Sequence, residues 1–315
     1  MRATLARLPF LPALLIALVL LAANGVLSPN AVGFRGLTGL VSTYLALMLI
    51  AVGQTYTVYA GDIDLSIGAV VSLVNVLVVT LMAGGDASAT TVLLGMALGL
   101  GVGAGCGLVN GLIVAGLRLQ PIVATFATGI VFTGLALSVM PVAGTPAPRL
   151  FWRTYGGRIL DVPFVLWAAG LLALVLVALA RTRLAVQLLA VGDGQAAAYQ
   201  TGLPVTAIRV RGYVLAGTFA ALAAFCITGA TASGDPLVGG AMTLSSVAAV
   251  VLGGSALAGG FGTALGSVFG ALIIALIESL VYFAGTPSAW QNFTKGVAIL
   301  LALMAGVVIS RAARA

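Results

Sequence analysis

The recurrence of long apolar runs restricts the fold of this chain more than any other feature. Runs of roughly 20 residues, enough to cross a ~30 Å hydrocarbon core, recur from Leu8 to Val308, and charged residues are confined to the gaps. The chain is 61% hydrophobic and only 7% charged, whereas a soluble globular domain carries about 25% charged residues. We therefore predict an all-α integral membrane protein rather than a soluble domain on a single anchor.

The hydropathy pattern predicts about ten transmembrane helices that form one transmembrane domain over residues 1–315. The predicted spans are 8–27, 38–59, 65–83, 90–115, 121–141, 162–180, 207–230, 244–257, 263–284 and 293–310. Arg2 and Arg7 precede the first run, which permits a cleavable signal. The length of that run and the many spans after it favour an uncleaved helix.

The arginines between the predicted spans favour a topology in which both termini face the cytoplasm, because basic residues collect in cytoplasmic loops. With that topology the cytoplasmic segments hold Arg2, Arg7, Arg118, Arg181, Arg183, Arg209, Arg211, Arg311 and Arg314, and the outer segments hold Arg35, Arg149, Arg153 and Arg158. The arginines thus mark topology, and the net charge of +7 does not predict a nucleic-acid partner.

Several kinds of site are excluded by residue content. The chain has no histidine, and its two cysteines, Cys106 and Cys226, lie far apart in apolar runs. We therefore expect no metal site, no disulfide scaffold and no catalytic residues, since no acid–base cluster appears either. A Gly-x-x-x-x-Gly-Lys-[Ser/Thr] phosphate loop is absent, because the one lysine, Lys295, follows Thr294 within a span. A transport protein without a cofactor of its own is expected. Its energy would come from an ion gradient or from another subunit, or its transport would be passive.

Two halves of the chain, about 1–141 and 162–315, present similar features in the same order. Tyr44 leads to the acidic segment 61–66, and Tyr213 leads to Gly234-Asp235 and a later Leu-Ser pair. Glycines spaced by four follow in each half: Gly99, Gly103 and Gly107 in the first, Gly262, Gly266 and Gly270 in the second. Five spans separate the matched elements, so the second copy enters the membrane from the opposite side. This order predicts an inverted five-helix repeat of the kind that transporters use.

The glycines spaced by four are expected to mediate helix packing, because a stripe without side chains lets a neighbouring backbone approach closely. The sequence from Gly99 to Gly103 has a superficial likeness to a dinucleotide-binding loop, but no strand precedes it. Close helix packing is the preferred interpretation.

Two carboxylates interrupt the apolar sequence in Gly61-Asp62-Ile63-Asp64-Leu65-Ser66-Ile67-Gly68. Ionisable groups at membrane depth are expensive, so Asp62, Asp64 and Ser66 are candidates for a functional site on a solute pathway. The alternative is that Asp64 caps the next helix and that Asp62 meets water or headgroups. Both interpretations can hold at once, since a capped, broken helix can line a polar cavity.

Other polar residues lie within the predicted spans. Gln54, Asn75, Asn110, Thr125 and Thr128 could line a path for a hydroxylated solute, or each could bond a neighbouring helix.

One acidic and one basic residue also fall within predicted spans. Glu278 and Lys295 could pair near the outer surface or snorkel to it separately, and a proton relay is the sharper alternative.

The cytoplasmic segment 181–206 is expected to contain a short alanine-rich helix. The helix would run through Gln195, Ala196 and Ala197, close at Gly202 and stop at Pro204. A rigid surface helix of this kind suits docking to a partner, and an idle connection is the alternative.

These motifs together resemble the permease subunits of bacterial ATP-binding-cassette importers for ribose and related monosaccharides. Segment 61–68 is similar to the Gly-Gly-Ile-Asp-Leu-Ser-Val-Gly signature of that group. Further similar blocks are 121–125, 133–137, 250–255, 259–263 and 290–296. The resemblance covers nearly the whole chain.

The resemblance implies a homodimeric permease in the bacterial inner membrane. It implies an extracytoplasmic solute-binding protein above it and ATP-binding-cassette ATPase subunits below it, with ATP and Mg on those subunits. Segment 181–206 would then be the coupling loop, which in this group carries Glu-Ala-Ala followed after three residues by Gly. Alignment on Gly202 places Ala196 where that glutamate is expected and Gln195 one position early. The individual contacts between this segment and the ATPase are therefore not predicted.

Other functions remain as alternatives. A gradient-driven secondary transporter would also explain the repeat, although buried carboxylates suited to ion coupling are scarce. Permeases for branched-chain amino acids or nucleosides share the broad architecture, and the Ile63-Asp64-Leu65-Ser66 segment is what favours sugars. A membrane-embedded enzyme would need an acid–base or metal cluster that the sequence does not contain. The particular sugar is not predicted.

Overall fold

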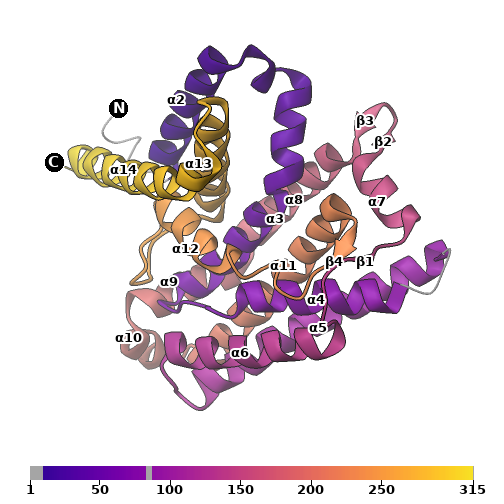
Figure 1. The fold of residues 1–315 in the computed structure, drawn as a ribbon. Coiled ribbons are helices and arrows are strands. Elements are labelled where there is room, and N and C mark those ends of the chain that lie inside the picture. The colour runs from indigo at the N-terminus through magenta and orange to yellow at the C-terminus, as the bar shows by residue number, and fades with distance from the viewer. Residues whose placement is uncertain (1–9, 83–86, 315) are drawn as a thin grey trace.

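The computed structural model describes residues 10–82 and 87–314. Arg2, Arg7 and the start of the first predicted span lie outside the described residues. Figure 1 shows a helical molecule in which α3 (Phe34–Tyr59) and α11 (Val205–Thr231) cross the middle. Helices α13 (Ala264–Phe283) and α14 (Ser288–Arg314) lie on one side of them, and α4 (Ile67–Met82), α5 (Ala89–Gly111) and α6 (Pro121–Val139) lie on the other.

Each of the ten predicted spans has a helix at its position. The remaining helices of the described chain are α2 (Leu11–Leu27), η1 (Pro29–Ala31), η2 (Leu112–Gly116), α7 (Arg149–Gly156), α8 (Phe164–Ala180), α9 (Arg183–Asp193), α10 (Gln195–Gln200) and α12 (Met242–Leu252). The helical fold class predicted from hydropathy is thereby confirmed.

Not every apolar helix is long enough to cross a bilayer by itself. Within the described residues, five helical segments meet a length and hydropathy criterion for spanning: α3, α5 with η2, α6, α11 and α13. The pair α8 and α9, bent by 65°, would add a sixth. Helices α2, α4 and α12 are shorter than 18 residues. The protein therefore has at least five membrane-capable helices, and the count of ten stays a prediction.

Local sequence explains where several helices begin and end. The side chain of Ser88 accepts from the Thr91 amide at the start of α5, and Pro121 occupies the first turn of α6. Helix α12 stops at Leu252, inside the predicted span 244–257, because Gly253 and Gly254 follow it. Gly254 has a φ of +86°, which ordinary residues adopt rarely.

Two short antiparallel ladders lie at one end of the molecule, beside α7 (Figure 1). Strand β1 (Thr145–Pro146) pairs with β4 (Ser233–Gly234), and β2 (Arg158–Ile159) pairs with β3 (Val162–Pro163). Helix α11 runs from α10 to β4, and its 27 residues correspond to about 40 Å. The α7 end and the α10 end of the molecule are therefore on opposite sides.

Glycines allow α5 and α11 to pack backbone against backbone. A Cβ on Gly103 would collide with the carbonyl oxygen of Gly217, and a Cβ on Gly217 would collide with that of Gly103. One turn later, a Cβ on Gly107 would collide with the carbonyl of Tyr213, whereas Gly99 faces Val78 and Phe225. The stripe thus lies at helix contacts with almost no room for a methyl group.

The second stripe is shorter than the sequence suggested. A Cβ on Gly266 or Gly270 would collide with the backbone of Gly253 or Ala249, so both glycines lie where α13 packs on α12. Gly262, which we expected to continue this stripe, instead lies in the loop before α13, and its Cβ position faces Ser255. Its φ of +155° suits a loop glycine rather than a helical one.

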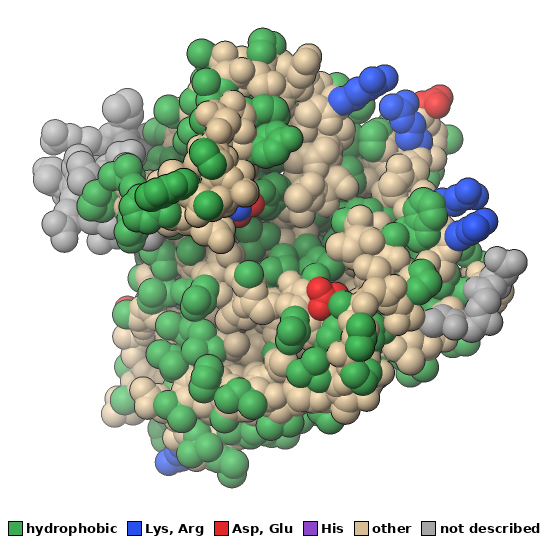
Figure 2. Space-filling model, viewed as in Figure 1, with side chains coloured by type: hydrophobic (Ala, Val, Ile, Leu, Met, Phe, Trp, Pro, Cys, Tyr) green, Lys and Arg blue, Asp and Glu red, His purple; other side chains and the backbone are tan. Residues whose placement is uncertain are grey.

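Much of the outer surface is apolar (Figure 2). Helix α6 exposes an almost continuous face of large side chains: Ile122, Val123, Phe126, Ile130, Val131 and Leu135. Such a surface requires lipid or another apolar partner rather than water.

Candidate functional site

The acidic segment 61–66 forms a break between α3 and α4. Helix α3 ends because Gly61 has a φ of +80°, and the amides of Gly61 and Asp62 donate back to the carbonyls of Val58 and Thr57. This is the Schellman arrangement that ends many helices, and it reverses the chain direction within one turn. The two carboxylates are thereby placed at the junction of two helices instead of on a helix surface.

Asp64 is fully enclosed and organises the start of α4. One of its carboxylate oxygens accepts from the Ser66 amide at 2.8 Å and from the Ser66 hydroxyl at 2.7 Å. The Gln54 side chain, with its nitrogen toward the Asp64 carbonyl at 3.1 Å, accepts from the Asp64 amide at 3.0 Å. Asp64 thus satisfies the backbone and hydroxyl donors of Ser66, immediately before the first residue of α4.

The network continues from Ser66 into α5 and α6. Asn110 donates to the Ser66 hydroxyl at 2.6 Å and accepts from Thr128 at 2.6 Å. Thr125 accepts from the Leu65 amide at 2.9 Å, so α6 also holds the break directly. The bonds of Asn110 and Thr125 join the break to α5 and α6, and together they fix the break in one conformation.

Asn75 lies elsewhere, although we grouped it with the same possible pathway. Its side chain donates to Thr228 at 2.7 Å and accepts from the Asp235 amide at 2.8 Å. It therefore bonds α4 to α11 and to the loop that follows α11.

Asp62 forms a buried ion pair with Arg209, which is near the start of α11. The guanidinium donates to both carboxylate oxygens, at 2.8 Å and 3.0 Å. The two side chains are only 3% and 10% exposed, respectively. Sequence reasoning missed this partner, although a buried carboxylate requires a cation and Arg209 is one of the few basic residues at the edge of a span.

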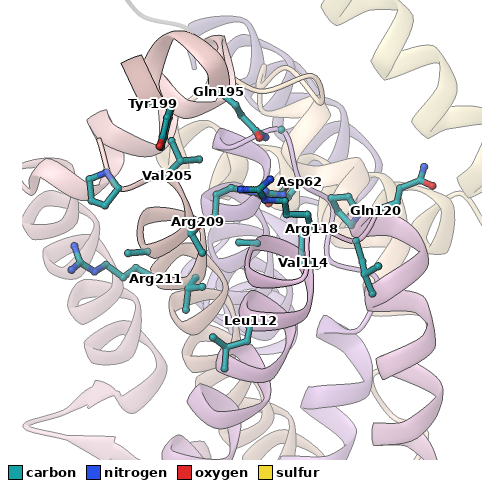
Figure 3. Close-up of a pocket in the computed structure, with 18 of the residues that line it drawn as sticks. Asp62, Leu112, Val114, Arg118, Gln120, Gln195, Tyr199, Val205, Arg209 and Arg211 are labelled. Carbon is teal, nitrogen blue, oxygen red and sulfur yellow. Dashed lines mark hydrogen bonds and ion pairs between the residues drawn. The ribbon is translucent and has the colours of Figure 1, made fainter. Parts of the chain in front are cut away.

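The ion pair borders a cavity of about 1230 Å³ at the α10 end of the molecule. Figure 3 shows Arg209 directed at Asp62, with Arg118 beside them, Gln195 above them and Arg211 pointing away. The wall is formed by η2, by the first residue of α6, and by residues on either side of Leu203, among them Ala196, Tyr199 and Pro204. The cavity thus connects segment 181–206 with the acidic break.

Segment 181–206 contains two helices, and the second is the predicted short alanine-rich helix. Helix α9 is followed at Gly194 by α10, which contains Gln195, Ala196 and Ala197. Gly202 has a φ of +83° in the turn after α10, and Pro204 immediately precedes α11. Tyr199 is 75% exposed on α10.

Three distant glycine segments meet beside the acidic break. A Cβ on Gly192 would collide with the carbonyl of Tyr59, and a Cβ on Gly259 would lie 2.7 Å from the Gly61 nitrogen and 2.9 Å from the Gly192 Cα. The Gly260 amide donates to the Tyr59 carbonyl at 3.1 Å. We call this contact of 59–61, 192 and 259–260 the glycine junction. It joins α3, α9 and the loop after α12 through backbone atoms.

Helix α4 also contacts α12 and the loop that precedes α12. The Gly68 amide donates to Thr243 at 3.2 Å, and the Gly239 amide donates to Ser72 at 2.9 Å. Sequence reasoning did not identify Thr243 or this contact, because nothing local indicates which loops meet.

Glu278 and Lys295 form a second ion pair far from the acidic break. Their nearest charged atoms are 3.4 Å apart. The side chain of Lys295 is 26% exposed and that of Glu278 is 33% exposed. Tyr44 donates to the same carboxylate at 2.5 Å. Among the described residues, no group of three or more His, Cys, Asp or Glu side chains is placed to hold a metal ion.

Comparison with known proteins gives a consistent assignment over almost the whole chain. A family model described as a branched-chain amino acid transport system / permease component matches residues 36–303. A ribose import permease protein of Bacillus subtilis is 33% identical over 94% of this chain and 91% of its own length. The ribose import permease protein of Escherichia coli K12 is 33% identical over 92% and 91%. An L-arabinose ABC transporter permease protein of Azospirillum brasilense is 29% identical over 92% and 85%. No solved structure matches the chain.

Proposed function

Because this chain belongs to the family of branched-chain amino acid transport permease components, we propose that it is the permease subunit of an ATP-binding-cassette importer for a monosaccharide. The observation that carries the proposal is the similarity to two ribose import permeases, which extends over more than nine-tenths of the chain. It is a multi-pass protein of the bacterial inner membrane.

A neutral polar solute fits the chemistry around the acidic break. The carboxylate of Asp62 is neutralised by Arg209, and the carboxylate of Asp64 is occupied by Ser66. At the acidic break both carboxylates are thus engaged by protein groups, which disfavours coupling to a cation gradient and hence a secondary transporter. The relatives named for ribose and L-arabinose favour sugars over amino acids.

Segment 181–206 is the proposed docking site for a separate ATPase subunit, which would bind ATP and Mg. Ala196, Tyr199 and Gln200 form an exposed face on α10, while Ala198 anchors the helix in the core. An exposed aromatic side chain on a short, anchored helix is a suitable contact for a partner.

Movement of α10 has a direct route to the acidic break. Helix α10 borders the same cavity as the Asp62–Arg209 pair, and α9 contacts the end of α3 at the glycine junction. ATP binding by the partner would favour one position of α10, and the permease would supply the element with two states. A second copy of the chain and an extracytoplasmic binding protein would complete the importer.

The predicted inverted repeat is also retained in this proposal. Its counterparts are α3 and α11, α4 and α12, α5 and α13, and α6 and α14. Contacts support the pairing, since α3 packs on α13 and α11 packs on α5. Asp64 and Asp235 each accept from the amide two residues later, Ser66 and Leu237, both at 2.8 Å. Two inverted five-helix halves would give ten spans with both termini on one side, and the arginine distribution favours the cytoplasm as that side.

Reconstitution tests the proposal. The permease is placed in proteoliposomes with its ATPase and binding protein, and uptake of ribose, L-arabinose, autoinducer 2 and leucine is compared with and without ATP. We expect ATP-dependent uptake of a monosaccharide that is insensitive to an uncoupler. Uptake without the ATPase, or uptake that collapses with the uncoupler, contradicts an ATP-driven importer. Uptake of leucine alone would leave the importer but overturn the sugar assignment.

A further inference from the structure

Three arginines surround a cavity at the α7 end of the molecule, opposite to α10. This cavity of about 570 Å³ is lined by Arg149, Arg153 and Arg158 together with backbone and side chains of α7 and β2. Within the described chain none of the three guanidinium groups forms an ion pair, and Arg153 lies 5.8 Å from the ring centroid of Trp152. Figure 2 shows several blue side chains along the edge formed by α7 and the β2–β3 hairpin. An anion is therefore expected here.

An apolar crevice of about 490 Å³ lies next to the arginines. Its walls come from α3, α5, α7, α8 and α11, and nearly all of its lining side chains are hydrocarbon. The hydroxyl of Tyr155, one of the few polar lining groups, already donates to the Ser42 carbonyl at 2.8 Å. Leu93 and Leu171 at the rim are 67% and 61% exposed, so the crevice opens on an apolar surface. A hydrocarbon chain fits this environment, and water does not.

The two cavities adjoin along α7. Leu150 and Thr154, one helical turn apart, line both of them. The Thr154 hydroxyl donates to the Leu150 carbonyl at 2.7 Å, so it presents no free donor at the passage. An extended molecule that lies across Leu150 and Thr154 would therefore reach both cavities.

Aromatic side chains place this passage at the level of lipid headgroups. Trp167 is half exposed at the start of α8, and its indole nitrogen donates to the Ile159 carbonyl at 3.2 Å. Trp152 lies on α7 beside Arg153. Tryptophans of this kind are enriched at the boundary between hydrocarbon and water. The arginines thus lie at headgroup depth and the crevice at acyl-chain depth.

We propose that the two cavities form one binding site for an anionic phospholipid. The phosphate is held by Arg149, Arg153 and Arg158, because guanidinium groups match phosphate oxygens in a fork geometry. One acyl chain fills the crevice between α5, α7 and α8. An acidic protein partner would satisfy the arginines but would leave the crevice unfilled, so a lipid accounts for both features.

Tryptophan quenching by brominated lipid tests the site in the full-length permease. Trp290→Phe removes the one tryptophan that lies outside this region, leaving Trp152 and Trp167 as reporters. The protein is placed in vesicles of phosphatidylethanolamine that contain brominated phosphatidylglycerol, and separately in vesicles with brominated phosphatidylethanolamine only. The ratio of apparent affinities gives the preference for the anionic lipid. We expect it to fall roughly fivefold for each arginine replaced by glutamine.

Matched variants separate headgroup and acyl contributions. Arg181→Gln with Arg183→Gln removes exposed arginines outside the cavity and should leave the preference unchanged. Ala168→Leu adds bulk within the crevice and should reduce quenching by either brominated lipid. Gly170→Leu on the same helix has open space at its Cβ position and should not.

Three results would overturn the proposal. One is an unchanged lipid preference in the Arg149→Gln, Arg153→Gln and Arg158→Gln triple variant with an unchanged melting temperature. Another is an unchanged preference accompanied by loss of ATPase stimulation by the binding protein, which would assign the arginines to a protein partner. Loss of transport without any change in lipid preference would likewise argue against a lipid site.

Discussion

Removal of Arg209 should destabilise the protein more than removal of an exposed arginine such as Arg211. The substitution Arg209→Met keeps the length of the side chain but leaves the Asp62 carboxylate buried without a cation. The pair comprises two charged hydrogen bonds of 2.8 Å and 3.0 Å between side chains that are 10% and 3% exposed. Each such bond contributes about 1.5–3 kcal/mol. We therefore expect a loss of about 3–5 kcal/mol in the free energy of unfolding, as for other broken buried pairs.

The assay is an unfolding titration with sodium dodecyl sulfate in mixed micelles, followed by circular dichroism. Arg211→Met is the matched control, because Arg211 lies two residues away on the same cavity but is exposed, and its loss should change the free energy of unfolding by less than about 0.5 kcal/mol. The double variant Asp62→Leu with Arg209→Met should recover much of the stability, since it leaves no buried charge.

Equal stability of Arg209→Met and Arg211→Met, or a double variant that is less stable than Arg209→Met alone, would contradict a dominant cost of burying the Asp62 charge without a cation. The first result would mean that water or headgroups reach Asp62. The second would mean that packing of the two side chains, and not compensation of charge, dominates their contribution.

Three further outcomes follow from contacts in the described chain. Gly107→Leu should destabilise the permease by more than about 3 kcal/mol, beyond ordinary overpacking, because a Cβ at Gly107 would collide with the backbone of α11. Gly105→Leu has open space at its Cβ position and should be tolerated, so equal melting temperatures of the two variants would contradict the close packing. Asn110→Leu should cost about 1–3 kcal/mol, measured by the same titration, because it removes the bonds that join Asn110 to Ser66 and Thr128; a neutral effect would argue against the network. Lys295→Met should lower stability by less than about 1 kcal/mol, because the pair with Glu278 is partly solvated, and a loss matching that of Arg209→Met would be inconsistent with this exposure.

Periodicity and composition were sufficient to predict the helices, because each is specified by its own residues. The apolar runs coincide with helices at every predicted span, and Pro121 opens α6 where the sequence places it. The exception is instructive: residues 253–257 are apolar enough to extend a span, but Gly253 and Gly254 end α12 before them. Hydropathy indicates whether a segment lies in lipid or in water, but it does not detect such breaks in the helical backbone.

Contacts between distant elements could not be predicted in the same way. Asp62 and Arg209 are 147 positions apart, and only the packing of α11 against α3 brings them together. Asp64 was ambiguous between a capping and a functional group, and its bonds to Ser66 show how a single carboxylate organises the helix start. The contact of Gly68 with the loop at Gly239 has no local signal, because a glycine close approach depends on which backbone arrives from elsewhere.

The glycine junction has a mechanical consequence. Where side chains separate two segments, a small displacement is absorbed by rotation about their χ angles, and the contact behaves as a compliant layer. At Gly61, Gly192 and Gly259 no such layer exists, because main-chain atoms of three segments touch directly. A displacement of α9 is therefore transmitted to the end of α3 and to the loop after α12 with no intervening side chains to absorb it.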